Sequence, residues 1–92
     1  FYGELKDAPM ISECPVNVEC KLIRTIKLPH CEVFMGKIIG VYIEEKYLTD
    51  DKPDVRKINP LIFEEGLGNY WKLGEHIGKI HNIGKEYKPK PK

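Results

Sequence analysis

Residues 16–28 read VNVECKLIRTIKL, and this stretch decides the fold class. Apolar side chains recur there at every second position, at residues 16, 18, 20 and 22 and again at 26 and 28, while polar residues stand at 17, 19 and 21. A strand with this alternation turns one face to a core and the other to water, as an antiparallel sheet allows. We therefore expect a half-buried strand that ends at Pro29, with Cys20 among its apolar positions and Glu19 on its water side.

The next stretch, residues 31–44, reads CEVFMGKIIGVYIE and is apolar at both parities. Its β-branched residues favour a strand over a helix, and such a pattern predicts a central strand that is covered on both faces. Gly36 and Gly40 inside it indicate a bulge or a bend. Because only Pro29 and His30 separate the two stretches, we expect them to pair as antiparallel neighbours.

The remaining segments predict little regular structure. Residues 1–13, broken by Gly3 and Pro9, indicate an irregular lead-in, and the polar residues 49–59 indicate an exposed excursion. Residues 60–63 predict a short strand, residues 64–69 a flexible turn, and the glycine-rich segment after residue 70 an extended, irregular path. We expect one partial domain over residues 1–84 and a basic flexible tail over residues 85–92, where lysine alternates with proline.

Length and composition limit the assembly. The 92 residues are 41% hydrophobic and 32% charged, which is typical of a folded domain. A β-rich chain of this size has a small core and commonly depends on a partner subunit or on further chain. A homodimer is therefore the expected assembly.

Charge and motif content exclude several classes of partner. A formal net charge of +1 does not attract nucleic acid, and no apolar run approaches the length of about 20 residues that crosses a bilayer. We expect no membrane partner and a cytoplasmic location. The three cysteines lack the paired spacing of a zinc site, and His76 and His81 are spaced wrongly for one helical face, so no metal and no disulfide is expected.

Three stretches in this order resemble the C-terminal half of the flavin reductase-like family, which includes flavoredoxins and FMN-dependent reductases built on a split barrel. They are ECPVNVEC at residues 13–20, HCEVFMGKI at residues 30–38, and NPLIF followed by YWKLGE within residues 59–75. The resemblance implies an all-β, mainly antiparallel fold that forms the C-terminal half of an FMN-binding split β-barrel. It also implies a flavin reductase or a flavoredoxin-like electron carrier.

The same resemblance implies four cofactor-binding residues. The family's histidine position is occupied here by Cys31, with His30 one residue earlier, and either would contact the flavin or the nicotinamide of an NAD(P)H reductant. The family's aromatic pair corresponds to Tyr70 and Trp71, whose planar rings suit a flavin ring. The imidazole could equally be a turn residue, and each aromatic could equally pack in a core or an interface.

Most family contacts to the FMN phosphate come from the N-terminal half, and this sequence has no glycine-rich phosphate loop or basic phosphate cluster. The chain begins at Phe1, so we expect the N-terminal half to be absent and a longer protein or a second chain to complete the barrel. The expected activity of the complete domain is that of an NAD(P)H-dependent flavin oxidoreductase.

Two other functions are compatible with a small barrel. A non-catalytic dimerisation or interaction module could be built on a partial barrel. A single-stranded nucleic-acid binder would need a basic groove with interleaved aromatics, whereas the lysines here gather in the tail and acidic residues share the strands.

Overall fold

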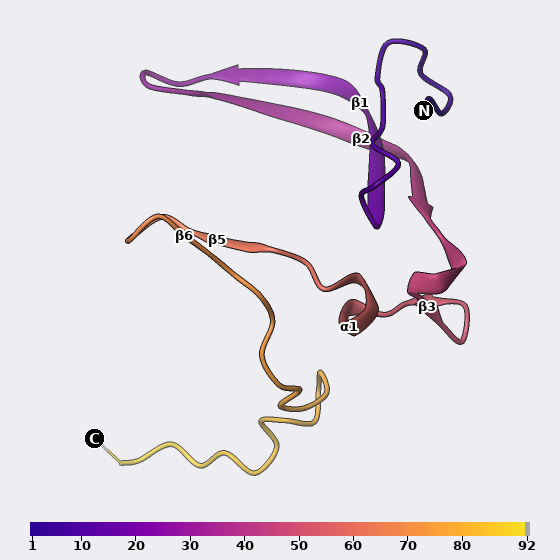
Figure 1. Ribbon diagram of the computed structural model, residues 1–92. Helices are drawn as coiled ribbons and strands as arrows, with labels where there is room; N and C mark the ends of the chain where they lie inside the picture. Colours follow the sequence, from indigo (N-terminus) through magenta and orange to yellow (C-terminus); the bar gives the residue numbers. More distant parts are fainter. Residues whose placement is uncertain (92) are drawn as a thin grey trace. The chain divides into compact units, whose positions relative to one another are not determined.

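The computed structural model describes residues 1–91, and its strands are antiparallel (Figure 1). The chain divides into two compact units, Phe1–Asn59 and Pro60–Lys92, and each is described by itself. The first unit contains the long strands and a short helical excursion. The second contains one small hairpin and an irregular C-terminal stretch.

The first unit is dominated by a hairpin of β1 (Val16–Lys27) and β2 (Glu32–Ile43), two 12-residue strands that run antiparallel. Residues 28–31 connect them, and the Leu28 amide donates to the Cys31 carbonyl at 2.9 Å to close the turn. Alternating apolar residues and a short connection are what a hairpin requires, and the predicted pairing of these two segments is confirmed.

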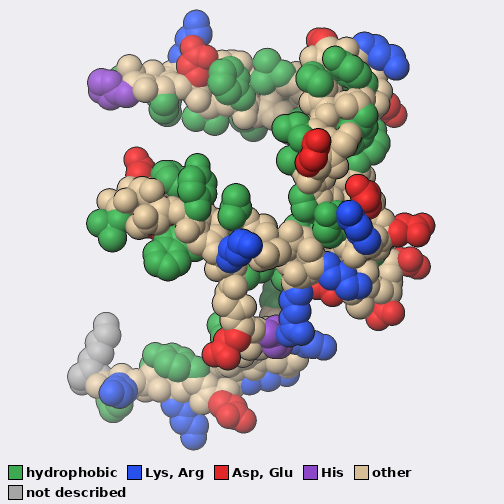
Figure 2. Space-filling view, viewed as in Figure 1, with side chains coloured by type: hydrophobic (Ala, Val, Ile, Leu, Met, Phe, Trp, Pro, Cys, Tyr) green, Lys and Arg blue, Asp and Glu red, His purple; other side chains and the backbone are tan. Residues whose placement is uncertain are grey.

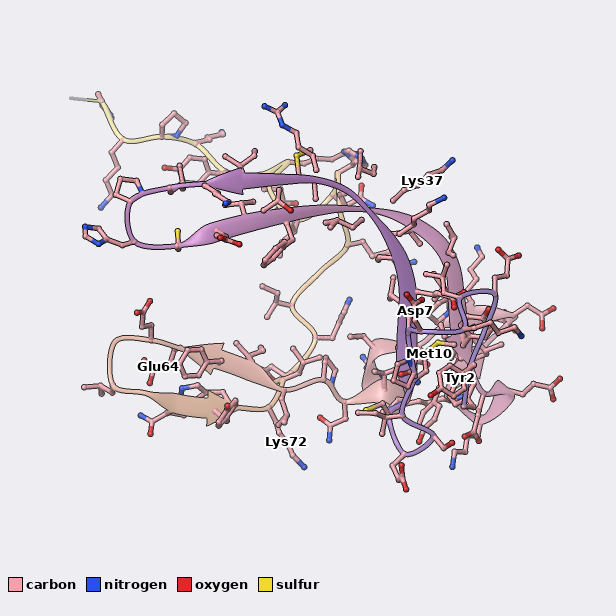
Figure 3. All side chains as sticks on the ribbon, turned by 90° about the horizontal axis from the view of Figure 1, so that it is seen from above. Tyr2, Asp7, Met10, Lys37, Glu64 and Lys72 are labelled. Atoms are coloured by element: carbon pink, nitrogen blue, oxygen red, sulfur yellow. The ribbon has the colours of Figure 1, made fainter. Side chains whose placement is uncertain are left out.

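The hairpin carries two register shifts. Glu19 faces Gly40 while Cys20 faces Ile38, so Ile39 is extra on β2; likewise Ile23 is extra on β1 between Leu22 and Arg24. Such bulges bend and twist a strand pair, and both strands curve together in Figure 3. A side-chain carbon added at Gly36 would lie only 3.0 Å from the Cys20 Cβ, so the glycine permits the close approach of the two strands there.

The predicted polar excursion is exposed but more ordered than expected. It follows the 3₁₀ turn η1 (Glu45–Tyr47) and contains β3 (Leu48–Thr49), β4 (Lys52–Pro53) and α1 (Val55–Ile58). Asp50 and Asp51 join β3 to β4 with φ angles of 52° and 60°, the left-handed pair that a two-residue hairpin turn needs. The one-turn helix is stable here because Asp54 caps it: its Oδ1 accepts from the Arg56 amide at 2.9 Å.

The second unit begins with the hairpin of β5 (Ile62–Glu64) and β6 (Asn69–Trp71). The loop between them contains Gly68 at a φ of 71°, a conformation that favours glycine. Residues 72–91 contain turns but no helix or strand, as the sequence predicts.

No hydrophobic residue among residues 1–91 is buried, which corrects two expectations. Figure 2 shows many apolar side chains open on the visible face. The segment from residue 31 to 44 is not covered on both faces, since Phe34 is 65% and Ile38 61% exposed. β1 is not half-buried on its apolar side either: Leu22 is 60% exposed and Cys20 is exposed as well. The physical reason is that a two-stranded ribbon supplies no second layer for either face.

Glu19 is the reverse case. The alternation placed it on the water side, yet it is the most buried residue described, with 2% of its surface exposed. Glu19 does lie on the face of β1 opposite the apolar side chains, as the alternation predicts. Residues 1–11 cover that face, so it is not open to water.

Candidate flavin site

The turn of the β1–β2 hairpin presents His30 and Cys31, the first two residues that the sequence singles out. Both are exposed, and Cys31 has a free thiol. The Cys31 carbonyl accepts the hydrogen bond that closes the turn, while the two side chains remain exposed.

The β5–β6 hairpin presents Tyr70 and Trp71, the second pair. Tyr70 lies opposite Phe63 and Trp71 lies opposite Ile62. Neighbours along a strand point to opposite faces, so the two aromatics cannot both stack on one planar ligand. Tyr70 shares its face with the Phe63 ring, at a centroid separation of 5.4 Å and an interplanar angle of 48°.

The Trp71 face also carries a carboxylate. Glu64 faces Asn69 across the hairpin, and its Oε2 accepts from the Leu67 amide at 2.8 Å. That hydrogen bond is the main reason why the pKa of Glu64 lies below its usual value; burial opposes it, and the Asn69 and Trp71 donors lower the pKa further. Figure 3 labels Glu64 at the β5–β6 hairpin. One face of the hairpin therefore carries Tyr70 with Phe63, and the other carries Trp71 with a carboxylate.

The four sequence-predicted residues thus form two pairs in different units: His30 and Cys31 in the first, Tyr70 and Trp71 in the second. Both aromatics are open, with 70% of Tyr70 and 56% of Trp71 exposed. Within residues 1–91, no three His, Cys, Asp or Glu side chains come together as a metal site. None of the described helices has the length and hydrophobicity of a membrane span.

A second polar arrangement lies at the base of the β1–β2 hairpin and was missed from the sequence. The Glu19 carboxylate accepts from the backbone amides of Glu4 and Leu5 and from the Tyr42 hydroxyl. Burial first, and then the charge of Glu19 and the hydrogen bond to it, raise the pKa of Tyr42. The only sequence signal was Gly3, whose missing side chain leaves room for this contact.

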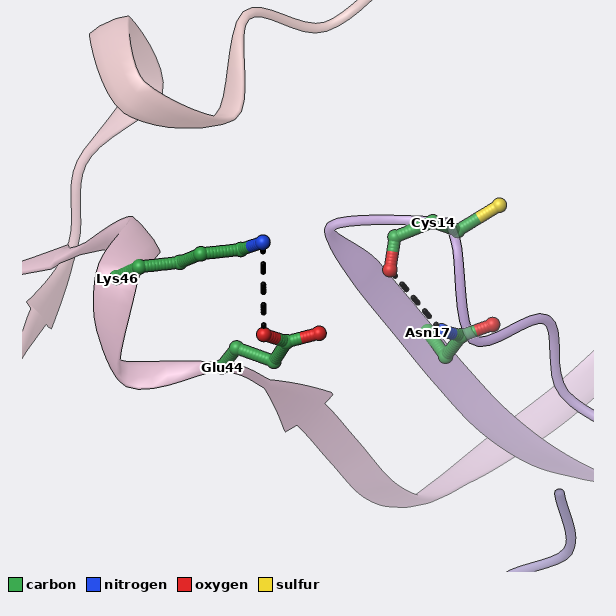
Figure 4. Close-up of polar contacts among 4 residues, drawn as sticks. All are labelled: Cys14, Asn17, Glu44 and Lys46. Atoms are coloured by element: carbon green, nitrogen blue, oxygen red, sulfur yellow. Dashed lines mark hydrogen bonds and ion pairs between the residues drawn. The ribbon is translucent and has the colours of Figure 1, made fainter.

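A pocket of about 370 Å³ lies beside this arrangement, between the lead-in and the end of β2. The Asn17 side chain donates to the Cys14 carbonyl at 3.4 Å at its edge, and Lys46 lies 3.7 Å from the Glu44 carboxylate (Figure 4). The Lys46–Glu44 pair is solvent-exposed, so it contributes little to stability.

No protein-family model and no curated protein matches the chain. Two solved structures do. The X-ray crystal structure of flavoredoxin from Methanosarcina acetivorans is 45% identical, with a TM-score of 0.87 over 92% of this chain and 46% of that one. Flavoredoxin of Desulfovibrio vulgaris (Miyazaki F) is 39% identical, with a TM-score of 0.78 over 90% of this chain and 44% of that one.

The chain therefore spans less than half the length of either flavoredoxin. Flavoredoxins have a flavin-binding split-barrel fold, and the mainly antiparallel strands of this chain correspond to part of it. Sequence identity and backbone similarity agree over nine-tenths of the chain. On these grounds the chain is similar in sequence and backbone to about half of a flavoredoxin-like family member.

Proposed function

We propose that this chain is part of an FMN-binding electron-transfer protein. The observation that carries the proposal is the 45% identity over 92% of the chain to a flavoredoxin. An identity of that size over nine-tenths of the chain favours retention of the cofactor as well as the fold.

The described residues fit one part of a flavin. Tyr70 and Phe63 form an open aromatic face, which suits a planar isoalloxazine and loses little conformational entropy on binding. The Trp71 face is less suitable because the Glu64 carboxylate lies on it and would repel the electron-rich reduced ring. Tyr70 is therefore our candidate for the flavin contact, and Trp71 our candidate for packing.

The hairpin turn offers a different contribution. His30 is exposed and can donate or accept a hydrogen bond, so it could contact the flavin edge or a nicotinamide. Cys31, at the position where the family has histidine, offers a smaller and weaker donor. His30 is thus the better candidate for orienting a bound ring, with Cys31 beside it.

FMN, when bound, supplies the electron-carrying chemistry, and the protein supplies position, hydrogen bonds and exclusion of water. NAD(P)H is one candidate donor, and with it the complete protein would act as an NAD(P)H-dependent flavin oxidoreductase. A redox partner protein is the other candidate donor. We place the protein in the cytoplasm, where both kinds of donor occur.

The phosphate end of FMN needs residues that this chain does not offer in sequence. We propose that a further half, in a longer chain or in a second chain, supplies them and completes the barrel, and that the assembly is a homodimer. The uncovered apolar side chains of both strands support this, since Leu22, Phe34 and Ile38 are each at least 60% exposed.

FMN titration tests the proposal. The intact natural gene product should quench flavin fluorescence stoichiometrically at micromolar concentration, and the isolated 92-residue chain should bind FMN poorly. An intact protein that leaves FMN fluorescence unchanged would contradict flavin binding and would favour the non-catalytic interaction module. Stoichiometric micromolar binding by the isolated chain would contradict the proposed division of the site.

A further inference from the structure

The lead-in at residues 1–11, here called the strap, is tied back on itself before it meets the strands. The Phe1 backbone nitrogen donates to the Met10 carbonyl at 3.0 Å, and the Met10 amide donates to the Phe1 carbonyl at 2.7 Å. Tyr2 pairs with Pro9 as an isolated antiparallel bridge. The strap is thus a small closed loop with its own backbone hydrogen bonds.

Glu19 fastens the strap to β1. Its Oε1 accepts from the Glu4 amide at 3.2 Å and from the Tyr42 hydroxyl at 3.3 Å, and its Oε2 accepts from the Leu5 amide at 3.1 Å. Hydrogen bonds to a buried charged acceptor are about twice as strong as neutral ones. Gly3 is needed for this approach, because a Cβ there would lie 2.5 to 2.7 Å from the Tyr42 hydroxyl and the Glu19 oxygens.

Two further contacts align the strap. The Asn17 side chain, two residues before Glu19 and on the same face of β1, accepts from the Ile11 amide at 3.1 Å and donates to the Ile11 carbonyl at 2.9 Å. The Phe1 ring meets the Tyr42 ring edge-on, with centroids 6.0 Å apart. Only the Glu19 fastening depends on a charge.

We propose that Glu19 is a proton-controlled latch, and that its protonation releases the strap from the β1–β2 hairpin. Both carboxylate oxygens already face donors. A proton added to either oxygen would point at an N–H or O–H group that now donates to that oxygen. At least one of these donors would then lose its hydrogen bond to the buried carboxyl group. The Asn17 contacts are neutral and would not respond.

The charges around the latch favour this behaviour. Tyr42 on β2 faces the carboxylate as a neutral hydroxyl, and Glu4 on the strap adds a second negative charge nearby. The strap carries the positive group Lys6 beside Leu5, and Lys21 with its partner Lys37 forms the next pair along the same face of the strands; among residues 1–91 none of the three forms a salt bridge with Glu19. Acid therefore removes the negative charge that accepts these three hydrogen bonds.

Release would also open the neighbouring pocket. Phe1, Ser12 and Cys14 form its wall on the lead-in side, while Val41 and Glu44 lie on the β2 side. When the strap leaves β1, the Phe1 side of the pocket leaves with it. The latch would thus couple proton concentration to access at the base of the hairpin.

Amide hydrogen exchange on the intact protein tests the latch, with rates corrected for the intrinsic effect of pH. From about pH 7 to about pH 3, a range that spans glutamate titration, the Glu4 and Leu5 amides should lose at least tenfold of their protection. The amides of the β1–β2 ladder should keep theirs. Glu19→Gln should abolish this acid step, because its amide carries no charge, and the matched Glu32→Gln on exposed β2 should retain it.

A strap that stays protected in acid would overturn the latch, as would a strap and ladder that exchange together or an acid step that persists in Glu19→Gln. If Glu19→Gln does not fold, Tyr42→Phe replaces it. That variant removes one donor and should raise Glu4 exchange several-fold near neutral pH without affecting the ladder; unchanged Glu4 exchange would then count against the latch.

Discussion

Tyr70 and Trp71 are neighbours in sequence, but they lie on opposite faces of β6 and have different surroundings. Tyr70 meets Phe63, whereas Trp71 shares its face with Ile62 and the Glu64 carboxylate. The sequence predicts the aromatic pair but cannot by itself say which member faces a ligand. The pairing register of the hairpin separates the two members.

Replacing each aromatic in the intact protein distinguishes their roles. Tyr70→Leu should raise flavin fluorescence per bound FMN and weaken FMN affinity by roughly two- to tenfold, since stacking contributes about 0.5–1.5 kcal/mol beyond buried area. Trp71→Leu should lower the melting temperature and leave the flavin signal unchanged. Tyr87→Leu, in the exposed C-terminal stretch, is the matched control. A flavin effect in Trp71→Leu alone would reverse the assignment.

Asp54 gives a pH-dependent prediction within the excursion. The Thr49 hydroxyl first, and then the Arg56 amide, hold the pKa of Asp54 below its usual value. A lowered folded-state pKa means that the carboxylate stabilises α1 fully above the unfolded value of about 3.9 and less as pH falls through the folded value. Carboxyl NMR titration should show an Asp54 midpoint below the usual aspartate value, and Thr49→Val should raise it. An Asp54 midpoint that Thr49→Val leaves unchanged would refute this cause.

At the scale of elements, the β1–β2 hairpin was predictable because period-two alternation and a short connection are local signals. A bulge or bend at Gly36 and Gly40 was predictable too, and both register shifts lie beside these glycines. The extra residues themselves were not predictable, because Ile23 and Ile39 differ in no local way from their paired neighbours. The helix α1 was missed for another reason. Four residues are too few for a periodic pattern, and Asp54 is recognised as a cap only from the hydrogen bond that it accepts from the Arg56 amide.

A glycine pair tests how closely β1 and β2 approach. Gly36→Ala would bring a methyl group to 3.0 Å from the Cys20 Cβ, and such overpacking costs on the order of 1–3 kcal/mol. Gly74→Ala meets nothing within 4 Å and should be neutral or stabilise by up to about 1 kcal/mol. Urea unfolding of the intact protein measures both. Equal effects of the two substitutions would show that the close approach is absent.

At the scale of the whole molecule, the sequence correctly predicts the resemblance to flavoredoxins and the all-β class. It does not predict which side chains are buried. Alternation shows which side chains share a face and not what covers that face. Glu19 and Leu22 make the point: the polar residue is 2% exposed beneath the strap, and the apolar one is 60% exposed. Coverage depends on chain that lies elsewhere in the sequence or in another molecule.

The uncovered apolar surface has a consequence for the isolated 92-residue chain. With no buried hydrophobic residue among residues 1–91, it lacks the main source of folding free energy. We expect it to bind a hydrophobic dye strongly and to melt without a cooperative transition. The intact protein should bind the dye weakly and melt cooperatively. A sharp thermal transition of the isolated chain at micromolar concentration would show that these faces are covered without further residues, for example by self-association.

The absorption spectrum of the intact protein as purified is the direct test of flavin binding. Flavin binding predicts a yellow protein with the two flavin bands, which bleach on chemical reduction and return in air, and whose chromophore is released as FMN on denaturation. A colourless protein that stays colourless after incubation with FMN would contradict the account.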